Sequence, residues 1–393
     1  MSTLHAESRA LRPNPVLTGM GSLVPLVIGV GLSLLLHFVI GPKVGDFYTK
    51  ILLDIGINII LAVSLNIVNG FTGQFSIGHA GFMAVGGYTA AAITYYTSMR
   101  VWGSADAHGG FLGVGEWLFV GSCIAGGCVA ALAGFLVGLP SLRLRGDYLA
   151  IVTLGFGEIF RVLLNQTGDV LFLADEVRET PIWKLPVKVG GSLGFTGLPF
   201  YTSLFWVFIF TSITVLAAYR LKESSLGRAF LSIREDEVAA EAMGIKTTRV
   251  KVTAFVIAAF FAGIAGGLFG HELGVTLNPQ DLGFQKSFDI VIMVVLGGMG
   301  SISGTTLAAI LLTILPEVLR SLAGPTVSFI QIFTTLTPET ADYIQQLVSN
   351  NLRMIVYALA LILMMILRPQ GLFGLGEIWR LRRAKPLKPE VAA

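Results

Sequence analysis

The sequence predicts a polytopic α-helical membrane protein. Its 393 residues are 54% hydrophobic and only 13% charged, and the mean hydropathy is +0.76. A soluble chain carries about a quarter charged residues, so this composition excludes an ordinary soluble enzyme. Several apolar runs approach the ~20 residues that a helix needs to cross a bilayer. The sequence has no repeated segments of about ten residues with alternating polarity, which argues against a membrane β-barrel.

About ten transmembrane helices are expected, within a range of eight to ten. In chain order, the expected spans are 21–40, 51–68, 80–96, 117–138, 148–164, 200–219, 252–270, 287–297, 305–319 and 352–367. The run 287–297 is short, so it either spans the membrane or re-enters it. Residues 1–20 form an N-terminal segment, 21–367 the transmembrane domain, and 368–393 a basic tail.

The distribution of basic residues predicts the orientation. Short basic segments are retained in the cytoplasm. With a cytoplasmic amino terminus, Arg143 and Arg145, the stretch 220–251 and the tail 368–393 all fall on the cytoplasmic side. Both termini are therefore expected in the cytoplasm, and the long loop 165–199 is expected outside.

The charged stretch 220–251 stands out in this apolar sequence because it carries seven basic and five acidic residues. Ser232 followed by Glu235 fits a capping box, in which each side chain accepts a hydrogen bond from an orphan amide of the first helical turn. Gly244 suits the left-handed exit of a helix. These signals predict a short amphipathic helix from Ile233 to Met243, in water between two spans.

Small and apolar residues at spacings of three and four give this short helix one continuous stripe. The stripe consists of Val238, Ala239, Ala242 and Met243. Such a surface can dock a soluble partner. A solvated loop with some helical content is the alternative interpretation.

Polar residues cluster around a glycine-rich interruption between the second and third spans. They are Asn66, Asn69, Gln74, Ser76 and His79. Broken helices at membrane depth are tolerated where they are buried in protein or line a water-filled cavity. The cluster therefore either lines a substrate path or holds the bundle together by hydrogen bonds, and the sequence leaves both readings open. No second ligand stands at metal-binding spacing from His79, so no metal site is predicted.

Two patterns within the spans predict packing rather than chemistry. Glu158 and Arg161 lie three residues apart on one predicted helix and are expected to neutralise each other. The seventh span carries small-residue pairs that let helices approach closely. These pairs are Gly263 with Gly267 and Gly266 with Gly270.

Motifs for several chemistries are missing from the sequence. It contains no G-x-x-x-x-G-K-[ST] loop for cradling ATP phosphates, no metalloprotease motif and no serine nucleophile elbow. We therefore predict no catalytic residues and no cofactor, and a function other than that of an enzyme.

Four segments together resemble the branched-chain amino-acid ABC permeases of the LivM type. They are Leu65–Phe82, which contains N-G-F-T-G-Q-F-S-I-G-H, Leu142–Glu158, Leu296–Ser301 and Arg368–Phe373. The resemblance extends over residues from about 50 to 375. The segment V-A-A-E-A-M-G ending at Gly244 is similar to the E-A-A-x-x-x-G loop by which importer permeases engage their ATPases. It departs at the first position, where Val238 stands in place of an acid and Glu237 lies one place early.

The resemblance implies the fold of an ABC importer permease, with a cytoplasmic coupling helix between the sixth and seventh spans. The residues implied for ATPase coupling are Glu237, Val238, Ala239, Ala240, Glu241 and Gly244. It also implies a bacterial inner membrane location and four kinds of partner: the lipid bilayer, a second homologous permease, two cytoplasmic ATPases and a periplasmic binding protein. ATP hydrolysis would take place on those ATPases.

The implied substrates are leucine, isoleucine and valine. Relatives in the same machinery take urea, short amides or other amino acids, so these substrates stay open. A secondary transporter would also have buried polar groups, but it would not need a capped docking helix. A membrane enzyme would need a convergent catalytic set, and the sequence offers none.

Overall fold

The computed structural model describes residues 15–141, 147–272 and 276–333, together with Leu359, Ile362 and Ile366. The predicted last span, 352–367, and the basic tail fall almost entirely outside the described residues, as do Arg143 and Arg145. In the described part, regular structure is helical apart from one isolated bridge between Phe195 and Leu277. The predicted all-helical class is confirmed.

The long helices follow the apolar runs of the sequence. In chain order they are α2 (Pro15–Leu35), α4 (Asp46–Asn66), α5 (His79–Val101), α6 (Val114–Ser141), α7 (Asp147–Asn165), α9 (Leu204–Glu223), α12 (Thr247–Gly270), α13 (Phe284–Gly297) and α14 (Ile302–Phe333). The π-helical turn η1 (Leu36–Ile40) and the short helix α3 (Gly41–Val44) extend α2, and a second π-helical turn, η2 (Ile67–Phe71), extends α4.

Six helical stretches in the described residues are long and apolar enough to cross a membrane. A shorter apolar stretch, Ile302–Val318, lies within α14. The expected total of eight to ten spans therefore remains a prediction. The span expected at 305–319 is too short, because the helix α14 continues to Phe333 where a loop was expected.

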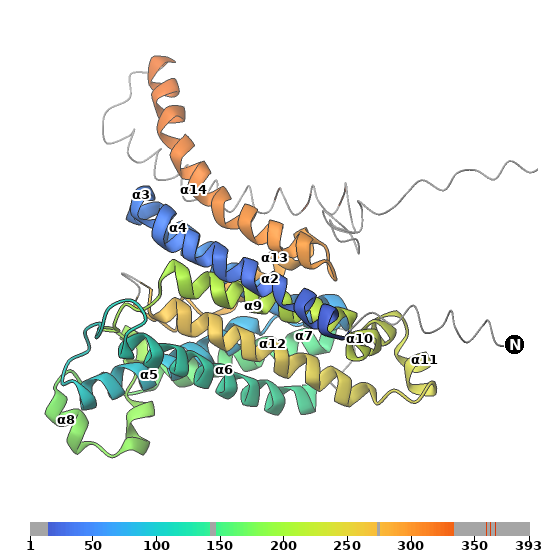
Figure 1. The fold of residues 1–393 in the computed structure, drawn as a ribbon, viewed down its shortest axis with the longest axis horizontal. Helices are drawn as coiled ribbons and strands as arrows, with labels where there is room; N and C mark the ends of the chain where they lie inside the picture. Colours follow the sequence, from blue (N-terminus) through green and yellow to red (C-terminus); the bar gives the residue numbers. More distant parts are fainter. Residues whose placement is uncertain are drawn as a thin grey trace, which may run out of the picture.

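The helices lie side by side with two distinct ends (Figure 1). At one end, which we call the α11 end, lie the beginning of α2 and the short helices α10 (Ser225–Glu235) and α11 (Glu237–Ala242). At the opposite end, the α8 end, lies the helix α8 (Ala174–Glu179). The helix α12 packs against α4, α5 and α6 in the middle of the bundle, whereas α14 leans away from it.

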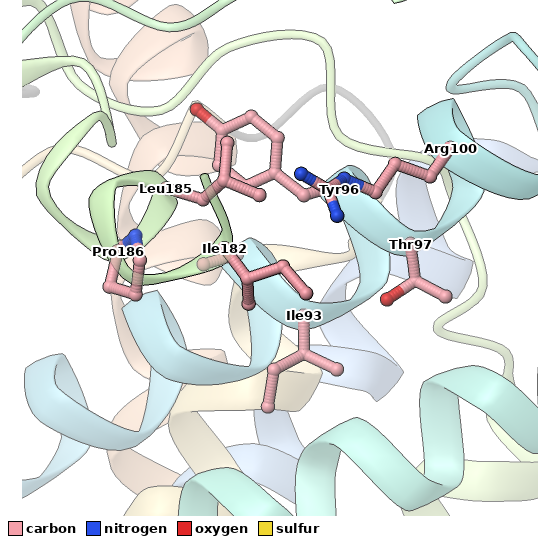
Figure 2. Close-up of a pocket in the computed structure, with 8 residues that line it drawn as sticks. Ile93, Tyr96, Thr97, Arg100, Ile182, Leu185 and Pro186 are labelled. Atoms are coloured by element: carbon pink, nitrogen blue, oxygen red, sulfur yellow. The ribbon is translucent and has the colours of Figure 1, made fainter. Parts of the chain in front are cut away.

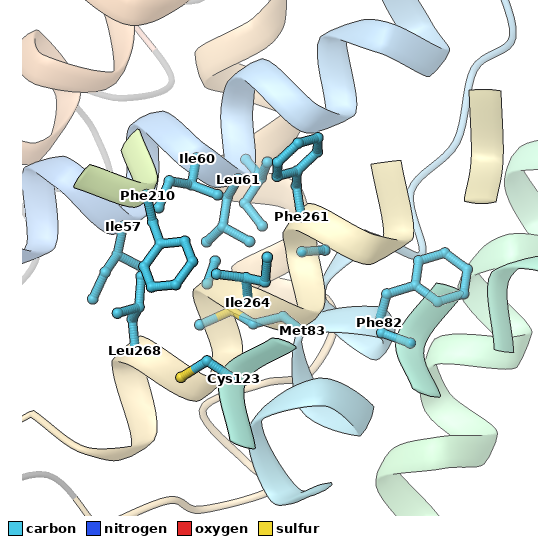
Figure 3. Packing of buried hydrophobic residues seen from close by; sticks show 14 of the residues in the cluster. Ile57, Ile60, Leu61, Phe82, Met83, Cys123, Phe210, Phe261, Ile264 and Leu268 are labelled. Atoms are coloured by element: carbon cyan, nitrogen blue, oxygen red, sulfur yellow. The ribbon is translucent and has the colours of Figure 1, made fainter. Parts of the chain in front are cut away.

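Buried apolar side chains from these helices form one continuous core (Figure 3). Ile60 and Leu61 of α4 are completely buried, and Leu268 of α12 and Met83 of α5 are equally inaccessible. Burial of each such side chain contributes about 1.5–3 kcal/mol. The core therefore fixes α4, α5 and α12 relative to one another.

Glycines bring the backbones of α5, α6 and α12 into direct contact, as the small-residue pairs predict. A Cβ atom added at Gly86 would collide with Gly263, and one added at Gly266 would collide with the carbonyl of Met83. A Cβ at Gly126 of α6 would meet the carbonyl oxygen of Gly86. We call these three helices the glycine-packed slab.

The segment expected to be a long outer loop is instead folded against α5. It contains α8 and two 3-10 turns, η3 (Ile182–Val187) and η4 (Gly191–Leu193). Arg100 at the end of α5 donates hydrogen bonds to the carbonyls of Val177 and Thr180. The hydroxyl of Tyr95 donates to the carbonyl of Leu171 at 3.1 Å. These bonds hold the segment against α5, so that it covers the α8 end of the bundle. We call this segment the cap.

We expect Gly126→Val to destabilise the bundle, because the added side chain would enter the contact between α6 and α5. Overpacking of a close contact costs about 1–3 kcal/mol. The measurement is the melting temperature of the purified protein in detergent. Gly121→Val on the same helix is the matched control, since a Cβ there meets nothing within 4 Å. Equal melting temperatures for the two variants would contradict this account of the slab.

Candidate functional site

The charged stretch folds into two short helices, so the predicted single helix from Ile233 to Met243 is wrong. The helix α10 is capped by Ser224, whose hydroxyl oxygen accepts a hydrogen bond from the amide of Gly227. The carboxylate of Asp236 caps α11 by accepting hydrogen bonds from the amides of Val238 and Ala239.

The predicted capping box is therefore wrong as well. Ser232 lies inside α10, where its hydroxyl donates to the carbonyl of Ala229. The chain breaks instead at Asp236, whose backbone is extended, with φ −156° and ψ 111°. Asp is among the preferred N-cap residues, and its side chain competes with helix-interior hydrogen bonds.

Two of the residues assigned to coupling anchor α11 to the start of α12. The carboxylate of Glu237 pairs with the Lys251 ammonium at 2.7 Å, and Glu241 accepts a hydrogen bond from the Thr247 hydroxyl at 3.0 Å. Ala240 is buried on this side. A bulky residue at Ala240 would thus disturb the packing of α11 itself.

All four residues of the predicted stripe face outward. Val238 is 64% exposed and Met243 is 83% exposed, and Ala239 and Ala242 are exposed as well. Gly244 ends the helix with a φ of +86°, a conformation that side chains disfavour. Together these residues form an uncovered apolar surface, which we call the α11 face.

The predicted interruption between the second and third spans is confirmed. After the π-helical turn η2, residues 72–78 have no helical structure, and α5 begins at His79. The Asn69 side chain accepts from the Ser76 amide at 3.1 Å and donates to the Ser76 carbonyl at 3.3 Å. His79 Nε2 lies 2.9 Å from the hydroxyl of Ser64. We call residues 67–78 the first break.

A second break separates α13 from α14. At Gly298–Ser301 the chain turns sharply, with φ values of +99° at Gly298 and +95° at Gly300. The Asn66 side chain connects the two breaks. Its oxygen accepts from the Gly300 amide at 2.8 Å, and its nitrogen donates to the Ser301 carbonyl at 3.1 Å.

Basic residues of the charged stretch reach both breaks. Arg234 of α10 donates to the carbonyl of Gly70 at 2.7 Å and to that of Met299 at 3.4 Å. Lys222 donates to the Gly300 carbonyl at 2.6 Å. The charged stretch is therefore hydrogen-bonded directly to the two irregular backbone segments, and we call this contact the Arg234 clasp.

The predicted polar residues thus lie around the first break, and most of them hydrogen-bond other groups of the protein. Asn66, Asn69, Ser76 and His79 are buried and bonded within the protein. Gln74 differs, because its buried Oε1 atom has no hydrogen-bond partner among the described residues. Sequence reasoning missed the role of Arg234, because it lies 164 residues from Gly70 and 65 from Met299 and no local pattern connects them.

The predicted pair on α7 is confirmed and has a further role. Arg161 donates to the Glu158 carboxylate at 2.6 Å. The same carboxylate accepts from the Phe284 amide at 3.1 Å, and Arg161 also donates to Gln280 at 3.0 Å. The pair therefore holds the beginning of α13 against α7.

A small cavity of about 210 Å³ lies at the α8 end, between α5 and η3 (Figure 2). Its walls are mostly apolar, with Ile93 and Tyr96 from α5 facing Ile182 and Leu185 from η3. Arg100 lies at its edge, and its guanidinium already holds the backbone of the cap. The cavity is a gap under the cap, with no cluster of functional side chains around it.

Comparisons with known proteins agree with the geometry. Residues 47–365 match the family model described as the branched-chain amino acid transport system / permease component. The permease LivM of Salmonella typhimurium is 36% identical over 339 residues, which cover 82% of this chain and 67% of LivM. The permease BraD of Pseudomonas aeruginosa is 27% identical over 291 residues, covering 67% of this chain and 85% of BraD.

The permease LivH of Salmonella typhi matches a shorter part of the chain. It is 30% identical over 191 residues, covering 48% of this chain and 53% of LivH. No solved structure matches the chain significantly. The family model covers most of the chain, including both breaks and the charged stretch between them. The chain therefore belongs to the family of branched-chain amino acid transport permeases.

Proposed function

We propose that this chain is the permease subunit of an ATP-driven importer, and that it forms part of the path by which leucine, isoleucine and valine cross the membrane. ATP hydrolysis would take place on two partner ATPases. A second homologous permease and a periplasmic binding protein would complete the complex. The family match and the names of the LivM and LivH relatives support this proposal.

The observation that carries the mechanism is the Arg234 clasp. The α11 face is apolar and uncovered, so it can receive a partner. The neighbouring helix α10 is bonded to both breaks through Arg234. A displacement of α10–α11 by an ATPase would pull on the two backbone segments that are not protected by helical hydrogen bonds. We infer that this is how ATP-driven motion reaches the transport path.

In this mechanism the first break acts as a gate near the α11 end. The Asn69 side chain bonds the amide and the carbonyl of Ser76 while this segment remains non-helical. Asn66 bonds the second break, and His79 bonds the Ser64 side chain. Gln74 is the member of the group with an unpartnered buried oxygen. It is the residue of the first break that we assign to contact with the transported molecule.

Two other functions compete with this one. A secondary transporter would have no reason to expose an apolar helix face next to a clasp on its own breaks. An importer of urea, short amides or other amino acids would have the same architecture. Uptake by the purified complex in proteoliposomes, comparing leucine with urea in the presence and absence of internal ATP, separates all three.

We propose that the α11 end faces the cytoplasm and the α8 end faces the periplasm of a bacterial inner membrane. Both termini and the basic tail 368–393 would then be cytoplasmic. The positive charges of the stretch 220–251 support this orientation.

A cysteine at position 243 is expected to resist labelling by a membrane-impermeant thiol reagent in intact cells, and one at position 183 is expected to react. Met243 is 83% exposed at the α11 end, and Trp183 is 77% exposed at the α8 end. The background variant lacks Cys128, which is an exposed thiol. Met243→Cys should become reactive once the cells are permeabilised. Its labelling in intact cells would overturn the orientation.

Ala239→Trp is expected to prevent ATPase binding without unfolding the permease. The site is on the α11 face, so a large side chain there would hold a partner away, whereas the packing of α11 on α12 would stay intact. Co-purification of the ATPase subunits measures the effect. Leu193→Trp, at an exposed position of the α8 end, is the control. Normal ATPase recovery with Ala239→Trp would mean that the α11 face is not the docking surface.

Arg234→Ala is expected to uncouple the importer. ATPase subunits should still bind and hydrolyse ATP, but leucine uptake per ATP should fall about 5- to 150-fold, the range typical of coupling free energies of about 1–3 kcal/mol. Arg228→Ala is the matched control, because Arg228 is an exposed arginine of the same helix and donates to the nearby Glu223 carbonyl. Unchanged uptake per ATP with Arg234→Ala would contradict the proposed role of the clasp.

A further inference from the structure

Charged side chains occupy one face of the bundle where α4, α13 and α14 meet. Lys50, Asp54 and Asn58 follow one another at four-residue spacing on α4, so they lie along one face of that helix. Lys286 of α13 donates to the Asn58 side-chain oxygen at 3.1 Å. The charges of Lys50, Lys286 and Glu317 act on the Asp54 carboxyl. We call these five residues the acid–base face.

Hydrogen bonds join all three helices at this face. The Asn58 amide nitrogen donates to the Thr313 hydroxyl of α14 at 2.9 Å, while its oxygen accepts from Lys286 of α13. Charged groups inside membrane-spanning segments are costly, and they usually face a bundle interior or a water-filled cavity. The acid–base face is therefore positioned to line a polar path.

An apolar cavity of about 750 Å³ adjoins the acid–base face between α4 and α14. Its walls include Ile51 and Ile55 of α4 and Ile314 and Val318 of α14. Glu317 is the one charged residue among the described residues that line it, and its buried Oε2 atom has no hydrogen-bond partner there. The cavity thus combines aliphatic walls, completed by the aromatic rings of Phe47 and Tyr48, with an unpartnered carboxylate oxygen.

Glu272, just beyond the end of α12, is a second carboxyl group without a partner. It is 1% exposed, and neither carboxyl oxygen has a hydrogen-bond partner among the described residues. Burial, together with the charge of Asp54, raises its pKa to about 8 against the opposing charges of Lys50 and Lys286. The group is therefore protonated at neutral pH. Two lysines and two carboxylates, Asp54 and Glu317, remain as the charges of this region.

Buried polar atoms without partners are rare in native proteins because each costs desolvation energy. Here they belong to two carboxyl groups at a face that carries two ammonium and two carboxylate groups beside an aliphatic cavity. A small zwitterion with an apolar tail complements this arrangement. Its ammonium group pairs with the carboxylates, its carboxylate pairs with the lysines, and its tail enters the cavity.

We propose that the acid–base face binds the head group of the transported amino acid, with Asp54 and Glu317 holding the α-ammonium, Lys286 the α-carboxylate, and the adjoining cavity the branched side chain. This inference rests on the proposed function and adds the residues that contact the substrate. It also bears on the open substrates, since urea and short amides carry no formal charges for such a face to pair. The first break then gates access to a site that lies elsewhere.

The test must separate substrate binding from a structural ion pair between α4 and α13. A single neutral substitution leaves an unpaired charge and can destabilise the bundle. The double variant Asp54→Asn/Lys286→Gln removes both charges together, so it restores an electrically balanced bundle. A structural pair predicts recovery in the double variant, whereas a head-group site predicts continued loss.

The complete transporter, with its partner permease, ATPases and binding protein, is reconstituted in proteoliposomes, and leucine uptake and ATP hydrolysis are measured together. We expect the double variant and Glu317→Gln each to lower leucine uptake per ATP hydrolysed by about tenfold or more, with an unchanged melting temperature. Removal of the exposed pair between Arg178 and Asp175 is the matched control and should change neither quantity.

Wild-type uptake per ATP in both the double variant and Glu317→Gln would overturn the inference while leaving the proposed function intact. Failure of the unaltered complex to take up leucine would overturn the proposed function, and this inference with it. Partial recovery by Asp54→Glu, which keeps the charge, would support the head-group assignment.

Discussion

The hydrogen bonds of Asn66 hold together the two irregular segments on which the rest of the molecule depends. Backbone that leaves the helical pattern at membrane depth loses its internal hydrogen bonds, and lipid offers no replacement. Asn66 supplies both a donor and an acceptor to residues that lie more than two hundred positions away in the chain. Without these bonds, the turn at Gly298–Ser301 would leave the buried amide of Gly300 unpaired, at a cost of about 1–3 kcal/mol.

This constraint explains why the charged stretch lies where it does. The same backbone segments present further carbonyls at the α11 end, and Arg234 and Lys222 donate to them. Arginine can bond two carbonyls at once because its donors form a fixed fork. A stretch that looked like a solvated connection is thereby part of the packing around both breaks, while its apolar α11 face stays uncovered.

The sequence predicted the fold class and most helix positions, because apolar runs of membrane length leave few alternatives. The first break was also predictable, since glycines and amides interrupt an apolar pattern only at some cost. The contact between Asn66 and Gly300 was not, because local spacing carries no information about which distant turn an amide will meet. The polar residues do lie together as the sequence predicts, but Asn66 bonds Gly300 and Ser301, which lie in a distant part of the chain.

The error at Ser232 has a different cause. Ser224, Ser232 and Asp236 are all acceptable N-cap residues, and serine and aspartate are nearly equivalent in that position. The choice is made by tertiary contacts, namely the pair of Glu237 with Lys251 and the burial of Ala240. The same contacts turn the predicted stripe of Val238, Ala239, Ala242 and Met243 outward, as its reading as a docking surface requires.

The glycine-packed slab has a mechanical consequence. Where backbones touch, no layer of pliable side chains lies between the helices to absorb a shear, and close-packed interiors transmit strain. When α10 is displaced, the helices α5, α6 and α12 therefore resist movement relative to one another. The helix α14, by contrast, leans away from the rest of the bundle. The three packed helices therefore stay fixed, and α14, which carries Glu317, is the helix with the most room to move.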